Sequence, residues 1–213
     1  MKPSKILKLS DPMEELSKSG SKLVNFITVT YFVVAVWEII SELFHYTPLI
    51  VVFKPIMPLI LVTLYCVAPE RRNPLYIVAM LLSSVTNTLF IPDDPQMLAI
   101  WLVVFTIHRI LVVTLVFKLA KVRDVVPIAI GTVPFLLIFF YMLMTSDVPQ
   151  DSFWVMVIQN ILISLLGGIA VSNYMMLDNR RNSWLLICGL LFVALQFIVF
   201  IEKYYLIAFS PSI

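Results

Sequence analysis

The sequence predicts an all-α fold, a polytopic transmembrane helix bundle of about seven spanning helices with a cytoplasmic N-terminus. Hydrophobic residues make up 61% of the chain and charged residues 13%, which is about half the charged share of a soluble domain. The hydrophobic residues form runs of about twenty, which match a hydrocarbon core about 30 Å thick. Lysine and arginine gather in alternate connections between these runs. These three observations predict a multi-pass membrane protein.

The first segment, residues 1–22, is polar and lysine-rich, and we interpret it as a cytoplasmic tail or an interfacial helix. Asp11 and Pro12 offer an N-cap and a first-turn proline for such a helix. No small-residue cleavage site follows the first apolar run, so a secretory signal peptide is not predicted. Because the later connections are short, residues 23–213 are predicted to form a single transmembrane domain.

Seven apolar runs follow, and each is long enough to be a spanning helix. They lie at about residues 23–44, 48–68, 74–91, 96–117, 125–144, 153–177 and 184–205. Prolines punctuate the connections between them, as helix breakers do. After Lys203 only about ten residues remain, which is too few for an eighth span.

The basic residues that flank the spans predict the orientation. One set of connections carries them: the N-terminal tail, Arg71 and Arg72, Lys118, Lys121 and Arg123, and Arg180 and Arg181. The other set carries no lysine or arginine before Lys203. By the positive-inside rule the N-terminus is cytoplasmic and the C-terminus is outside. This orientation is that of a multi-pass protein, and the membrane we expect is a bacterial inner membrane.

Several polar side chains are predicted inside the spans, in the outer half or near the middle of the membrane. They are Glu38, Glu42, Lys54, Ser83, Asn87, His108, Arg109, Asn160 and Gln196. A charge at mid-membrane costs on the order of 2.5 to 3.5 kcal/mol. Since side chains that face lipid would stay unsatisfied, we expect these groups to converge on a polar cavity that opens outward.

Each of these polar groups also has a structural interpretation. Lys54 is expected to pair with Glu38, although it could instead extend outward to the membrane surface. The amides could form hydrogen bonds between helices, and Gly167-Gly168 could bend a helix or pack helices closely. We interpret Cys66 and Cys188 as buried core residues. No metal site or cofactor is predicted.

Three motifs on successive spans carry a resemblance to a known family. They are Phe53-Lys54-Pro55, then Ser84 with Thr86-Asn87, then the Phe-rich run at residues 105–108 that ends in histidine. These motifs resemble the YhhN-like family of integral membrane proteins. That family includes lysoplasmalogenases, which hydrolyse the vinyl ether bond of lysoplasmalogens to a fatty aldehyde and a glycerophospho-base. The resemblance is best over residues 48–118.

The resemblance implies two intramembrane aspartates that perform acid–base chemistry, and this chain departs from that pattern. Asn87 stands at the first position. Residues 188–196 resemble the family segment that carries the second aspartate, which places Gln196 at that position. An alternative placement puts Asn173 at the second position. Leu111 replaces a tyrosine of the family pattern. An amide cannot transfer the proton that vinyl ether hydrolysis needs.

Three functional hypotheses follow. The first is a lysoplasmalogenase-like hydrolase with a rebuilt site, in which Glu38 or His108 is the acid–base group and Asn87 positions the water. The second is a non-catalytic relative that binds a lysolipid or another membrane lipid, and the third is a small transporter in which Lys54 and Arg109 attract an anion. The expected substrate-binding residues are Lys54, Ser83, Ser84, Arg109, Asn160 and Gln196. No nucleic-acid partner is expected, and the oligomeric state stays open.

Overall fold

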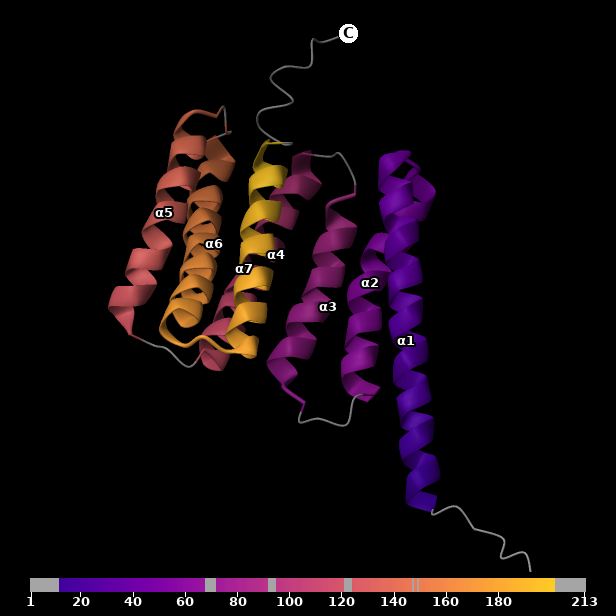
Figure 1. Cartoon of the computed structure of the whole chain (residues 1–213). Helices are drawn as coiled ribbons and strands as arrows, with labels where there is room; N and C mark the ends of the chain where they lie inside the picture. Colours follow the sequence, from indigo (N-terminus) through magenta and orange to yellow (C-terminus); the bar gives the residue numbers. More distant parts are fainter. Residues whose placement is uncertain are drawn as a thin grey trace, which may run out of the picture. The chain divides into compact units, whose positions relative to one another are not determined.

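The computed structural model of the chain describes residues 12–67, 72–91, 95–120, 124–146, 148 and 150–201. Over these residues the chain forms seven α-helices and no strand (Figure 1). They are α1 (Pro12–Leu43), α2 (Thr47–Val67), α3 (Pro74–Leu89), α4 (Pro95–Leu119), α5 (Val125–Met144), α6 (Gln150–Met176) and α7 (Arg180–Ile201). Six are long and apolar enough to cross a membrane, and α3 is shorter, with 16 residues. The prediction of an all-α multi-pass protein is confirmed.

The main difference from the predicted spans is at the start of α1. This helix begins at Pro12 and continues to Leu43 without a break, so residues 12–22 are helical and belong to the same helix as the first span. Its position at a membrane surface and the cytoplasmic N-terminus stay predictions. The Asp11 N-cap and Lys203 belong to segments outside the described residues.

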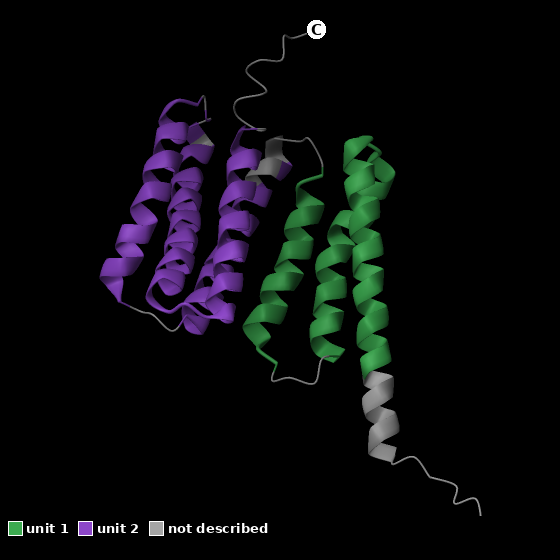
Figure 2. Ribbon diagram, in the orientation of Figure 1, with its two compact units in different colours: residues 1–91 green, residues 92–213 purple. Residues whose placement is uncertain are grey.

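The chain divides into two compact units, which are described separately (Figure 2). In the unit of residues 1–91, α2 contacts both α1 and α3. In the unit of residues 92–213, α6 contacts α4, α5 and α7 and is the most buried of the apolar helices. Each unit is therefore organised around one central helix. The prediction of a single domain over residues 23–213 stays a prediction.

A tight turn joins α1 to α2 and sets their antiparallel packing. The backbone N–H of Tyr46 donates to the Ser41 carbonyl at 2.9 Å, and that of His45 donates to the Glu42 carbonyl at 3.1 Å. This is a Schellman arrangement, and His45 takes the left-handed conformation it needs, with φ of 51°. The turn places the C-terminal end of α1 beside the first half of α2.

Small residues let α5 and α6 approach closely. A Cβ atom added to Gly168 would lie 2.0 Å from Oγ1 of Thr132, and one added to Gly131 would lie 3.0 Å from the Gly168 carbonyl oxygen. The interpretation of the Gly167-Gly168 pair as a close-packing element is thus confirmed.

Large apolar side chains cover much of the outer surface of the helices. Phe26 on α1 is 70% exposed and Ile130 on α5 is 69% exposed, a surface that suits lipid rather than water. The two cysteines belong with this pattern, since Cys66 is half-buried and Cys188 is exposed on α7. Their interpretation as buried core residues was wrong.

Candidate functional site

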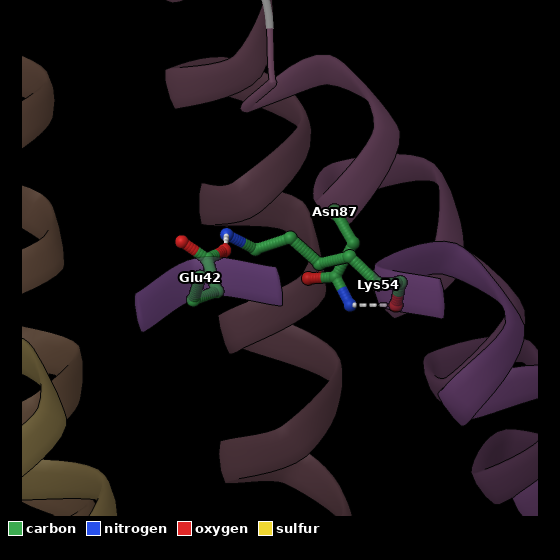
Figure 3. A network of polar contacts seen from close by, with 3 residues as sticks. All are labelled: Glu42, Lys54 and Asn87. Atoms are coloured by element: carbon green, nitrogen blue, oxygen red, sulfur yellow. Dashed lines mark hydrogen bonds and ion pairs between the residues drawn. The ribbon is translucent and has the colours of Figure 1, made fainter. Parts of the chain in front are cut away.

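The predicted site residues fall into two clusters, one in each unit. In the first unit, Glu42, Lys54 and Asn87 form a connected polar group (Figure 3). In the second unit, Arg109 and Gln196 are joined by a hydrogen bond. The sequence predicts that all these residues line one cavity. Because the two clusters belong to different units, that stays a prediction.

Lys54 forms an ion pair with Glu42 rather than with the predicted Glu38. Its Nζ lies 2.5 Å from Oε1 of Glu42 and 5.0 Å from the centre of the Phe90 ring. Side chains on a helix lean toward its N-terminus, and the N-terminal end of α2 is the end joined to the α1–α2 turn. Lys54 therefore extends toward the turn, and its ammonium meets the Glu42 carboxylate (Figure 3). Glu38 lies one turn before Glu42 on α1, farther from the α1–α2 turn, and is half-buried.

Asn87 completes the hydrogen bonding of a helix that proline interrupts. Because Pro58 has no N–H, the Lys54 carbonyl lacks its partner within α2. The Asn87 side-chain amide donates to that carbonyl oxygen at 2.9 Å (Figure 3). One turn earlier on α3, the Ser84 hydroxyl donates to the Pro55 carbonyl at 2.7 Å. Asn87 thus hydrogen-bonds between helices, as the structural interpretation of the amides predicts, and Ser84 does the same.

The neighbouring polar residues of α3 make bonds within their own helix. The carbonyl of Ser83, which is half-buried, accepts the Thr86 hydroxyl at 2.8 Å. The Thr88 hydroxyl donates to the Ser84 carbonyl at 3.0 Å. A role of Ser83 and Ser84 in binding a substrate stays a prediction.

In the second unit, Arg109 is buried, with 8% of its surface exposed. Its Nη2 donates to Oε1 of Gln196, and its guanidinium lies over the Phe105 ring, 4.4 Å from the ring centre. His108 is 5% exposed and stacks against the same phenyl ring, with 6.1 Å between ring centres. Although His108 and Arg109 are adjacent in sequence, both line one small cavity. From the sequence, only one of these two adjacent helical residues needed to face a cavity.

Two buried asparagines of α6 contact neighbouring helices, Asn160 through its side-chain amide and Asn173 through its backbone carbonyl. Asn160 donates to the Phe139 carbonyl on α5 at 3.4 Å. The Asn173 carbonyl accepts the side-chain amide of Asn182, at the start of α7, at 2.9 Å. Neither contact joins these amides to the Arg109–Gln196 pair, so a role of Asn160 in substrate binding stays a prediction.

Sequence reasoning missed Gln159, which is 1% exposed. Its side-chain amide donates to the Leu102 carbonyl at 3.3 Å and to the Thr106 hydroxyl at 3.2 Å, both on α4. Its signal was the same one that singled out Asn160, an amide inside an apolar span. Among the described residues, no three His, Cys, Asp or Glu side chains gather closely enough to hold a metal ion.

The sequence model of the YhhN family matches residues 49–212, which are most of the chain. The chain belongs to the YhhN family. The matched residues contain Lys54 and Asn87, whereas Glu42 precedes them. No curated protein and no solved structure matches this YhhN protein.

Proposed function

We propose that this YhhN protein binds the headgroup of a lysolipid at the Glu42–Lys54–Asn87 cluster and does not hydrolyse it. A lysolipid phosphate is an anion that the Lys54 ammonium can bind by charge-assisted hydrogen bonds. The side chain of Lys54 is 22% exposed and that of its partner Glu42 is 41% exposed, so a phosphate can reach the pair and compete with Glu42. In the same proposal the N-terminus is cytoplasmic, the membrane is a bacterial inner membrane and the cluster faces outward.

The hydrogen bond of Asn87 supports binding over catalysis. Cleavage of a vinyl ether begins with protonation of a carbon atom, which needs an acid at the site. The family resemblance places Asn87 at the position of the first aspartate, and its side-chain amide donates one hydrogen bond to the Lys54 carbonyl. That contact stabilises the helix pair and transfers no proton.

A binding measurement on the purified full-length protein tests this proposal. Titration with lysophosphatidylethanolamine in detergent is expected to show binding that Lys54→Gln weakens by about ten- to a hundredfold, since a charge-assisted hydrogen bond contributes on the order of 1.5 to 3 kcal/mol. Glu42→Gln is expected to tighten binding, because it frees the ammonium. Lys118→Gln removes an exposed charge on α4 and is the matched control. Equal affinity of the wild type and Lys54→Gln would contradict the proposal.

The second candidate is the hydrolase with a rebuilt site, and Glu38 is the observation that favours it. Glu38 lies one turn from Glu42 on α1 and is half-buried. A carboxyl group beside an ammonium and a phosphate site can act as an acid–base group. This candidate differs from the first in one measurable respect, the release of a fatty aldehyde.

A further inference from the structure

Arg109 is a buried cation that has no carboxylate partner in the part of the chain that the structure describes. A guanidinium stays protonated in proteins, and an uncompensated buried charge is costly inside a membrane. Its Nη2 bonds to Gln196, a neutral amide, and its face stacks on Phe105. Its Nη1 is buried and has no hydrogen-bond partner among the described residues. The charge of Arg109 thus needs a counter-ion.

A cavity of about 20 Å³ adjoins this guanidinium. Its polar lining comes from Arg109 and His108 on α4, and apolar side chains of α4, α6 and α7 complete it. Both ring nitrogens of His108 are buried and have no partner within the described residues. A single water molecule needs roughly 10 to 15 Å³ by this kind of measure, so the cavity fits one water molecule or one monatomic ion.

We propose that this cavity binds a small monovalent anion of the halide class, held by Nη1 of Arg109 and a ring N–H of His108. Arginine can only donate, and a neutral imidazole still offers one N–H. Oε1 of Gln196 already accepts a hydrogen bond from Nη2 of Arg109. Water could satisfy these donors but would leave the charge uncompensated. Phosphate and carboxylate groups are larger than the space.

This site lies in the second unit and does not depend on lipid binding at Lys54. Thermal unfolding of the purified full-length protein tests it, with sodium chloride and sodium bromide compared against sodium gluconate at constant ionic strength. We expect the unfolding temperature to rise with halide concentration and to saturate, as it does when a ligand binds only the folded state. The rise should persist in Lys118→Gln, a control on the same helix, and disappear in Arg109→Gln.

A second measurement needs no variant. Crystals grown in bromide are expected to show an anomalous scattering peak within hydrogen-bond distance of Arg109 Nη1 and His108. An equal rise in gluconate, a rise with inorganic phosphate but not with halide, a halide effect retained in Arg109→Gln, or the absence of a bromide peak would each overturn the proposal.

Discussion

Gly168→Ala is expected to destabilise the protein by about 2 kcal/mol, because overpacking costs about 1 to 3 kcal/mol and outweighs the helix propensity gained. The new Cβ would lie 2.0 Å from Oγ1 of Thr132, 2.8 Å from the Thr132 backbone nitrogen and 2.9 Å from the Ile128 carbonyl oxygen. The hydroxyl can rotate away, but the backbone atoms cannot. The close approach of α5 and α6 must therefore loosen, and unfolding of the purified protein would measure the loss.

Gly167→Ala is the matched control for this change. Its Cβ would meet only side-chain carbons, of Phe135 at 2.9 Å and of Val193 at 3.1 Å. Side chains can shift, and alanine is favoured over glycine in a helix by about 1 kcal/mol, so the expected net change is small. A Gly168→Ala protein as stable as Gly167→Ala would show that the two helices do not depend on this crossing.

Asn87→Leu is expected to cost about 1 to 2 kcal/mol, because it leaves the Lys54 carbonyl without a partner. Its cost should fall to near zero in a Pro58→Ala background. The alanine restores the backbone N–H that bonds to the Lys54 carbonyl within α2. The double-mutant cycle thus isolates the carbonyl as the shared partner of residues 58 and 87. Free energies of unfolding of the four proteins give the coupling.

Thr88→Val is the control in both backgrounds, since the Thr88 hydroxyl bonds only to the Ser84 carbonyl in its own helix among the described contacts. We expect Thr88→Val to lower the free energy of unfolding by the same small amount with and without Pro58. An equal cost of Asn87→Leu with and without Pro58 would mean that the amide acts through another contact.

Six of the helices could be predicted from the sequence because their apolar runs have the length that a bilayer requires, whereas α3, with 16 residues, is shorter. The exposed face of each helix could not be predicted: Cys188 was expected to be buried and is exposed. Lipid and protein core are both apolar, so hydropathy does not separate them. The N-cap and proline signals at residues 11 and 12 predicted a helix that begins there, but hydropathy gave no sign that this helix continues into the first span.

In the site, the need of Lys54 for a carboxylate could be predicted from its depth, but the choice of Glu42 over Glu38 depends on the direction of the side chain. The role of Asn87 was left open by the sequence. Pro58 did indicate that the Lys54 carbonyl lacks its helical partner, since a proline frees the carbonyl four residues earlier. That Arg109 is buried with no carboxylate partner among the described residues could only be seen once the helices were packed.

The most direct test of the central claim is a single incubation of the purified protein with lysoplasmalogen, in which bound lipid and released fatty aldehyde are both measured. We expect saturable lipid binding and no aldehyde above the protein-free control, because an amide stands where the proton donor is expected. Steady aldehyde release that Glu38→Gln abolishes would contradict it and would establish the rebuilt hydrolase.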